Sequence, residues 1–177
     1  MPQVTDGLSD TEEVGKQIAQ RRKEIFEQTY LPTLQPAPGA RALLMHLRHR
    51  GLTLTVATSA QAADLEALLT AAGVADLIHE QVTADDAEHA KPDPDLVHAA
   101  LVKAKVAAAQ AIMLGDTPYD VQAARAAGVP TIAVCCGGWD TAHLRDAGAV
   151  AVYTDPADLL AHYDSSPLAA ARLPQIS

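Results

Sequence analysis

The chain has 177 residues, 49% of them hydrophobic and only 3% aromatic, and its formal net charge is -9 at pH 7. This composition excludes a disordered protein and predicts a core made mainly of Ala, Leu and Val, while the negative charge argues against nucleic acid or an anionic membrane as the main partner. The only cysteines, Cys135 and Cys136, are adjacent, and neither a signal peptide nor a membrane-length apolar run is apparent. We therefore expect a soluble, cytoplasmic protein.

The first predicted helix begins near Ser9, where Ser9 and Glu12 fit a capping box. Its apolar residues are sparse among charged ones, so this helix has little surface to bury by itself. Three prolines between residues 32 and 38 then form a stiff connector that cannot continue a helix. The sequence therefore predicts three parts, namely a first segment with its linker (1–37), a core domain (38–163) and an unpacked C-terminal tail (164–177).

From residue 40 onward, apolar runs typical of strands alternate with amphipathic runs typical of helices, and a glycine follows nearly every helix. This alternation predicts an α/β protein with a three-layer, Rossmann-like parallel sheet that has helices on both faces. The predicted strands cover residues 52–57, 78–83, 111–114, 131–134 and 149–153. The predicted helices cover residues 40–50, a stretch through 65–69 that ends at Gly73, 92–102, 121–127, 141–146 and 156–162.

Polar residues follow three of these strands, at the edge where open α/β sheets bind their ligands. Thr58 and Ser59 follow the first strand, Lys91 lies in the connection after the second, and Asp116 and Asp120 follow the third. A hydroxyl and the first amides of a helix can bind phosphate, a lysine can neutralise its charge, and two carboxylates suit Mg²⁺. Simpler interpretations are helix caps for the hydroxyl and carboxylate residues and a solvated loop lysine. The residues alone leave both interpretations open.

A glycine pair and the single tryptophan follow the fourth predicted strand, as Gly137, Gly138 and Trp139. Two interpretations of this segment stay open: a mobile loop beside the polar edge, or a loop whose tryptophan packs beneath it. The histidines are scattered without the spacing of metal ligands, so we interpret them as surface or helix residues.

The segments VATS (56–59), AKPDPD (90–95) and GDTPYD (115–120) together resemble motifs two, three and four of the haloacid dehalogenase superfamily of phosphatases. The resemblance extends from about Ser9 to Tyr163 and is greatest to the phosphoglycolate phosphatase and beta-phosphoglucomutase-like subfamily. That subfamily has a small helical cap inserted between motifs one and two. The resemblance therefore implies that residues 1–37 include the last part of such a cap.

The resemblance implies phosphate-binding roles for residues of motifs two and three. Thr58 would hydrogen-bond the transferring phosphoryl group, and Ser59 and Ala60 would add backbone contacts. Lys91 would balance the charge of the phosphate and of the nucleophile. These roles agree with the physical demands of phosphoryl transfer, which are mainly positioning and stabilisation of charge on the phosphoryl oxygens.

The resemblance also implies a Mg²⁺ cofactor at motif four. Asp116 would bind the ion directly, and Asp120 would support the metal site through water or hydrogen bonds. The implied activity is a Mg²⁺-dependent phosphatase that acts on a small phosphorylated metabolite through an aspartyl-phosphate.

Motif one of the family, an apolar strand ending in Asp-x-Asp-Gly whose first Asp is the nucleophile, is not found in the sequence. The nearest string, Val4 to Gly7, places Val4 at the nucleophile position, and valine cannot form a phosphoaspartate. The family places this strand between the strands that end here at Thr58 and Leu114, so its absence would leave two edges unpaired. We therefore expect an N-terminally truncated reading of a longer protein.

Two functions follow from these observations. The first is the phosphatase, incomplete or inactive as this chain because the nucleophile is missing. The alternative is a non-catalytic binding or regulatory module, assembled as a homo-oligomer or with a partner that supplies a strand. The joint presence of Thr58, Lys91, Asp116 and Asp120 favours catalytic ancestry, because a binding module has no need of all four.

Overall fold

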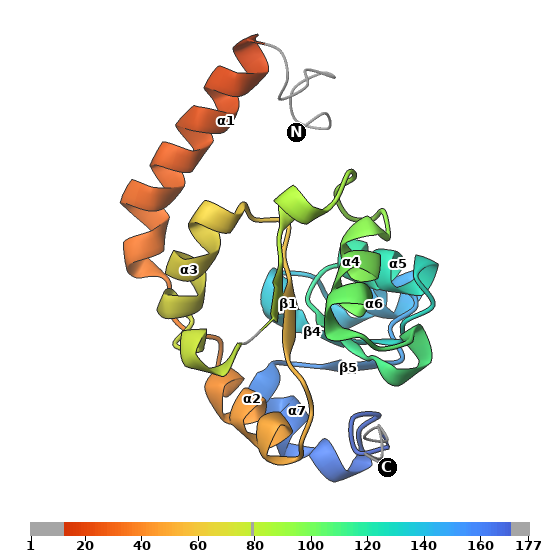
Figure 1. The fold of residues 1–177 in the computed structure, drawn as a ribbon. Coiled ribbons are helices and arrows are strands. Elements are labelled where there is room, and N and C mark those ends of the chain that lie inside the picture. The colour runs from red at the N-terminus through yellow and green to blue at the C-terminus, as the bar shows by residue number, and fades with distance from the viewer. Residues whose placement is uncertain (1–12, 79, 171–177) are drawn as a thin grey trace. The chain divides into compact units, whose positions relative to one another are not determined.

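The predicted alternation of strands and helices is present in the computed structural model, in which residues 13–78 and 80–170 are described (Figure 1). The chain divides into two compact units, Met1–Gln35 and Pro36–Ser177. The helices are α1 (Glu13–Ile25), α2 (Ala40–His49), α3 (Ala62–Ala71), α4 (Asp95–Ala104), α5 (Pro118–Ala126), α6 (Thr141–Ala147) and α7 (Pro156–Ala161). The strands are β1 (Thr55–Ala57), β2 (Glu80–Val82), β3 (Met113–Gly115), β4 (Thr131–Val134) and β5 (Ala151–Tyr153).

The first unit is built on α1, which continues into a π-helical segment, Phe26–Tyr30, and a short 3-10 helix, Leu31–Thr33. Its apolar side chains stay partly in solvent, with Val14 53% and Ile25 40% exposed. The helix therefore buries little apolar surface, as its composition predicts. The expected capping box at Ser9 and Glu12 lies outside the described residues. Within the described ranges, no helix combines the length and the apolar character needed to cross a membrane.

The strands of the second unit are all parallel and form two groups. β1 pairs with β2, and β4 lies between β3 and β5. Thr55 lies opposite Glu80 in the first group, and Met113 lies opposite Thr131 in the second. Among residues 13–78 and 80–170, no backbone hydrogen bond joins β1 to β3. Within this part of the chain, β1 and β3 therefore each have one edge without a strand partner.

The strands differ in how deeply their residues are buried. Every residue of β4 is buried, as expected for a parallel strand with a neighbour on each side and helices on both faces. By contrast, Leu114 in β3 is 38% exposed, and all residues of β1 are only half-buried. The hydroxyl Oγ1 of Thr55 in β1 is buried and has no hydrogen-bond partner. β1 and β3, each with one edge that lacks a strand partner among the described residues, are therefore incompletely packed.

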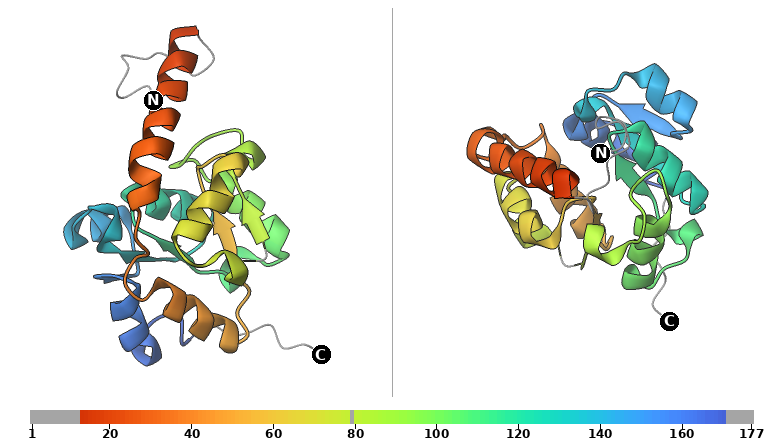
Figure 2. Two further views of the ribbon diagram at one scale, coloured as in Figure 1. Left: turned by 90° about the vertical axis from the view of Figure 1, so that its left-hand side faces the viewer. Right: turned by 90° about the horizontal axis from the view of Figure 1, so that it is seen from above.

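Helices cover both faces of the β1–β2 pair. Leu65 and Leu69 of α3 form a buried cluster against which Val56 of β1 packs. Figure 1 shows α3 on one side of β1 and α4 on the other, and α4 contacts both strands. The left view in Figure 2 shows β1 and β2 side by side, with α3 in front of them.

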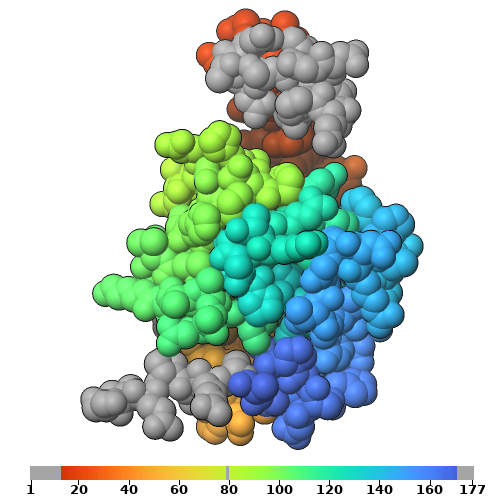
Figure 3. All heavy atoms as spheres, turned by 90° about the vertical axis from the view of Figure 1, so that its right-hand side faces the viewer, coloured from red at the N-terminus to blue at the C-terminus, as the bar shows by residue number. Residues whose placement is uncertain are grey.

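The β3–β4–β5 group is likewise covered on both faces, because neighbouring residues of β4 contribute to different clusters. Ile132 packs with residues of α2 and α7, including Leu43 and Leu159. The next residue, Ala133, packs with Val121 of α5 and Leu144 of α6. In Figure 3, atoms of α4, α5 and α6 lie side by side on the face turned to the viewer. The predicted three-layer α/β fold is thus confirmed.

The prediction of an unpacked tail after residue 163 is wrong for the described part of that segment. Ser166 is 4% exposed, and its hydroxyl donates to the Tyr163 carbonyl at 2.7 Å. Leu168 is 9% exposed and belongs to the buried cluster around Leu43 and Leu159. The chain returns to the core here because apolar side chains of α2 and α7 leave a surface that Leu168 covers. Residues 171–177 lie outside the described part.

Candidate active site

Asp120 holds the turn between β3 and α5 together. Its Oδ2 accepts hydrogen bonds from the Thr117 amide at 3.0 Å, the Thr117 hydroxyl at 2.7 Å and the Asp116 amide at 3.3 Å. Thr117 is the N-cap of α5 and its hydroxyl accepts from the Asp120 amide, which completes a reciprocal capping box. The helix-cap interpretation of Asp120 is therefore correct, and it accounts for one of the two carboxylate oxygens.

The other oxygen of Asp120 accepts a hydrogen bond from Lys91. The Lys91 ammonium Nζ lies 2.7 Å from Asp120 Oδ1 and 3.4 Å from the Ala57 carbonyl oxygen, and the side chains are only 14% and 9% exposed. Burial alone would raise the pKa of Asp120, but the Lys91 charge and the bonds from Lys91 and Thr117 outweigh it and lower this pKa. Lys91 is therefore a largely buried ion-pair partner, not a solvated loop lysine, and it joins the end of β1 to the start of α5.

Asp116 lies at the same strand end in a different electrostatic situation. Its carboxyl is half-buried, and its pKa is raised first by burial and second by the negative charge of Asp120. A carboxylate in this position gains from a nearby cation, because the charge of Lys91 is already directed at Asp120. A hard divalent cation such as Mg²⁺ fits this donor, since it binds through one or two carboxylates and keeps several waters.

Thr58 and its neighbours form the turn after β1. The Thr58 amide donates to the Val82 carbonyl of β2 at 3.0 Å, and the Thr58 hydroxyl accepts from the Ala60 amide at 3.1 Å. Ser59 is exposed. The N-cap of α3 is Gln61, so the simpler interpretation of Thr58 or Ser59 as an N-cap is wrong. The Thr58 hydroxyl keeps its own proton for donation to a ligand.

The structure thus brings Lys91 into direct contact with Asp120 and with the carbonyl of Ala57. Thr58 directly follows Ala57, so it lies at the same strand end. Asp116 is bonded through its amide to Asp120. These residues come from three separate connections that converge at the carboxyl ends of β1 and β3. The string Val4 to Gly7, the nearest match to motif one, lies outside the described residues.

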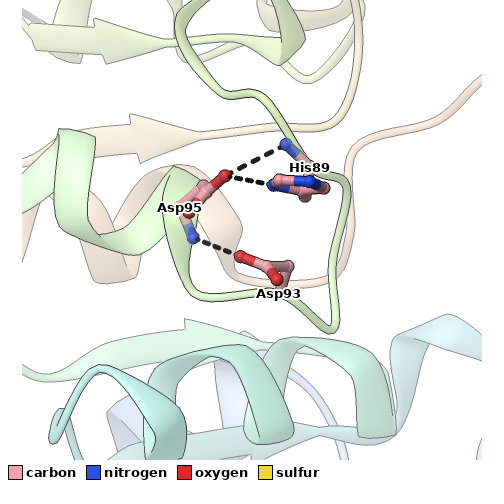
Figure 4. A group of neighbouring side chains, drawn as sticks. All are labelled: His89, Asp93 and Asp95. Carbon is pink, nitrogen blue, oxygen red and sulfur yellow. Dashed lines mark hydrogen bonds and ion pairs between the residues drawn. The ribbon is translucent and has the colours of Figure 1, made fainter.

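Hydrogen bonds among His89, Asp93 and Asp95, which we call the clasp, close the loop that bears Lys91 (Figure 4). They were not predicted from the sequence. The amide and the ring nitrogen Nδ1 of His89 lie 3.1 and 2.9 Å from Asp95 Oδ2. The Asp95 amide donates to Asp93 Oδ1 at 3.2 Å, and the Asp93 amide donates to the Ala90 carbonyl at 3.1 Å. Because Asp95 begins α4, the clasp fixes the loop to that helix. The only sequence signal was a histidine six residues before a helix-initiating aspartate.

The clasp predicts a pH dependence of stability. The hydrogen bond to Asp95, followed by the charges of Asp93, Asp95 and Glu88, raises the pKa of His89. A raised folded-state pKa means that the contribution is fully present below the ordinary histidine pKa and is lost as pH rises through the raised value. We expect His89→Ala to lower the melting temperature most near about pH 5 and least near about pH 9.

The matched control is His98→Ala, which removes an exposed histidine from α4 itself. Thermal unfolding followed by circular dichroism across this pH range should show no such pH-dependent difference for it. A His89→Ala difference that stayed constant with pH would contradict the charged clasp.

Comparisons with known proteins show which family and which proteins this chain resembles. The sequence pattern of the haloacid dehalogenase-like hydrolase family matches residues 3–134. A phosphoglycolate phosphatase of Rhodospirillum rubrum is 38% identical over 157 residues, which cover 86% of this chain and 65% of that protein. The chain spans between 43% and 65% of the length of the curated phosphoglycolate phosphatases that it matches.

Solved structures are similar over most of the chain. A hydrolase from Pseudomonas syringae has a TM-score of 0.82 and 32% identity, covering 88% of this chain and 71% of that one. A putative beta-phosphoglucomutase from Bacteroides vulgatus has a TM-score of 0.78 and 28% identity, covering 96% of this chain and 67% of that one. The motif resemblance is thereby confirmed, and the chain belongs to the haloacid dehalogenase-like hydrolase family, among its phosphoglycolate phosphatase and beta-phosphoglucomutase-like members.

Proposed function

We propose that this chain provides the phosphate-binding and metal-binding parts of a Mg²⁺-dependent phosphatase site that acts on a small phosphorylated metabolite. The observation that carries this proposal is the position of Lys91, whose ammonium lies between the Ala57 carbonyl and the Asp120 carboxylate. A largely buried lysine where three connections converge is suited to neutralising a phosphate dianion. Phosphatase relatives support the reaction class.

The proposed roles follow the donors and acceptors of the site. The Thr58 hydroxyl and the Ser59 amide donate hydrogen bonds to phosphoryl oxygens, and Lys91 balances their charge. The Ala60 amide already donates to Thr58 Oγ1, so it is a secondary donor. Asp116 holds Mg²⁺, and Asp120 fixes Lys91 and the turn. When bound, Mg²⁺ stabilises negative charge on the phosphoryl oxygens.

We further propose that the nucleophile lies on an apolar strand between β1 and β3. Three observations support this position: the two strands are unpaired on one edge within the described residues, Leu114 is 38% exposed, and Thr55 Oγ1 is buried without a partner. A parallel strand ending in an aspartate here would place its carboxylate beside Lys91 and Asp116. A longer form of this polypeptide or a partner chain can supply such a strand. Its first aspartate would attack phosphorus and break the bond to the alcohol oxygen, which would leave with a proton from the second aspartate. Water would then hydrolyse the aspartyl-phosphate, releasing inorganic phosphate and restoring the carboxylate.

The decisive experiment joins an apolar segment ending in Asp-x-Asp-Gly to the N-terminus of the chain and measures phosphate release from an aryl phosphate. We expect turnover with Mg²⁺, none with EDTA, and none in the Asp116→Asn variant. The matched control is the same fusion with its first Asp changed to Asn, which keeps the strand and removes the nucleophile. A folded fusion without metal-dependent turnover would refute the proposed function.

The second candidate is a non-catalytic module whose β1 and β3 edges, unpaired among the described residues, bind a strand of a cytoplasmic partner or of a second copy. The divided sheet favours it, because open edges recruit extended segments. Turnover by the Asp fusion separates the two functions, because a module needs only the strand. In that case the Asp fusion and its Asn control would stabilise the chain equally, and neither would turn over substrate.

A further inference from the structure

The loop that follows β4 lies directly against Asp116. Its residues Cys135–Gly137 form a 3-10 turn, and Gly138 continues in the left-handed region at φ 79°. A methyl group added at Gly137 would overlap the Asp116 carbonyl oxygen and would lie 2.9 Å from the carboxyl carbon of Asp116. Such a Cβ contact is too close to be tolerated, so something must move. The loop backbone therefore forms a wall of the Asp116 site, and only glycine fits at residue 137.

Trp139 attaches this wall to the turn that bears the two aspartates. Its ring is edge-to-face with that of Tyr119, with centroids 6.3 Å apart, and Tyr119 lies between Asp116 and Asp120 in the chain. The Trp139 ring is also 5.5 Å from that of His143 in α6. Trp139 packs against the buried cluster of Val121, Ala133 and Leu144. The interpretation of Trp139 as a packing residue is thus correct.

We propose that Gly137 and Trp139 are positioning residues for Asp116, with the glycine admitting the loop backbone and the tryptophan holding it there. This inference rests on the proposed cation site. An isolated carboxylate rotates freely about its side-chain bonds, and a metal ligand gains affinity when its neighbours restrict that rotation. Gly137 restricts Asp116 from one side, while the amide of Asp116 is held by Asp120. Cation affinity therefore depends on two residues outside the matched motifs.

Trp139 also supplies the measurement, because it is the only tryptophan of the chain. Tb³⁺ is a hard cation that prefers oxygen ligands, and its luminescence is sensitised by a tryptophan close to it. Selective excitation of Trp139 in the purified chain should give Tb³⁺ luminescence that saturates, is displaced by Mg²⁺ and is lost in Asp116→Asn. Gly137→Ala should weaken Tb³⁺ binding about tenfold or more.

Gly138→Ala is the matched control, because it changes the adjacent glycine without crowding Asp116. Residue 138 has a left-handed φ, and a methyl group there would meet nothing within 4 Å. The control thus introduces backbone strain into the same loop but leaves the wall intact. We expect its Tb³⁺ affinity to stay within about twofold of the parent chain.

A second pair of variants tests the tryptophan and decides the matter if Gly137→Ala does not fold. Trp139→Ala should weaken Tb³⁺ binding in calorimetry, and Trp139→Phe, which keeps an aromatic ring against Tyr119, should restore most of it. Equal affinities for both would overturn the inference.

The outcomes separate the two proposals. If the parent chain and Asp116→Asn bind Tb³⁺ alike, the Asp116 cation site fails and the positioning role fails with it. If only Asp116→Asn loses binding while folded Gly137→Ala matches the parent, the cation site stands and the positioning role is overturned.

Discussion

Replacing Asp120 with alanine is expected to lower the free energy of unfolding by about 3 to 5 kcal/mol, the range typical of removing one partner from a buried ion pair. The substitution deprives Lys91, whose side chain is only 14% exposed, of its carboxylate partner, and it removes the acceptor of the Thr117 hydroxyl and amide. It also deletes half of the capping box at α5. Urea denaturation at neutral pH, followed by circular dichroism, measures this loss.

Asp76→Ala is the matched control for Asp120→Ala. Asp76 forms a bidentate pair with Arg41 at 2.6 and 2.8 Å, which lowers the pKa of Asp76 to about 2, but the Asp76 side chain is 61% exposed. Solvent screening makes the contribution of such an exposed pair to stability small, so we expect a much smaller loss for Asp76→Ala than for Asp120→Ala. Equal losses for the two variants would contradict a buried role for Asp120.

Asp120→Ala should also change how the stability of the chain depends on acid pH. The lowered pKa of Asp120 means that its contribution is present above the ordinary aspartate pKa and is lost as pH falls through the lowered folded-state value. The difference between the parent chain and Asp120→Ala should therefore be full at neutral pH and shrink on acidification.

Replacing Gly39 with alanine is expected to lower the free energy of unfolding by about 2 to 5 kcal/mol. Gly39 has φ 73°, and a methyl group there would lie 2.6 Å from the Cα of Ala157 at the start of α7. The Ala157 amide donates to the Pro38 carbonyl at 3.0 Å, so α7 cannot withdraw without losing that bond. The substitution thus adds a backbone clash to a left-handed conformation.

Gly128→Ala isolates the clash from the backbone strain. Gly128 has the same φ of 73°, but a methyl group there would come no closer than 3.9 Å to the Ala108 side chain. We expect a loss of only about 1 to 2 kcal/mol for this variant, because strain alone remains. Chemical denaturation of both variants gives the comparison, and a Gly39 variant no less stable than the Gly128 variant would refute the close approach.

The elements most accurately predicted from the sequence are those whose pattern has a single cause. Residues 131–134 form β4 as predicted, because a strand buried on both faces is a continuous apolar run bounded by polar residues and turns. The run 52–57 was predicted as one strand, yet β1 covers only Thr55–Ala57. Leu52 and Leu54 are apolar because they pack against the core cluster, not because they pair with a neighbouring strand.

The candidate site was predictable as a set of residues but not as a set of contacts. Local sequence patterns predict the strands, and the candidate residues follow the ends of these strands in the chain: Thr58, Lys91, Asp116 and Asp120. The bond between Lys91 and Asp120 joins residues 29 positions apart and depends on the path of two loops. The contact of Gly137 with Asp116 is equally non-local, since it depends on how closely two backbones approach.

The division of the sheet also shapes how this chain acquires and loses order. Across the described residues, no ladder of hydrogen bonds runs from β1 to β3, so the two strand groups are coupled by the packing of α2 and α4 and by the Lys91 to Asp120 pair. Each pair of neighbouring strands is parallel and joined by a crossover that contains a helix, namely α3, α5 or α6, so strand pairing within each group is non-local and entropically costly. The order of the two groups is therefore expected to depend on these side-chain contacts, and loosening the Lys91 to Asp120 pair should reduce the cooperativity between them.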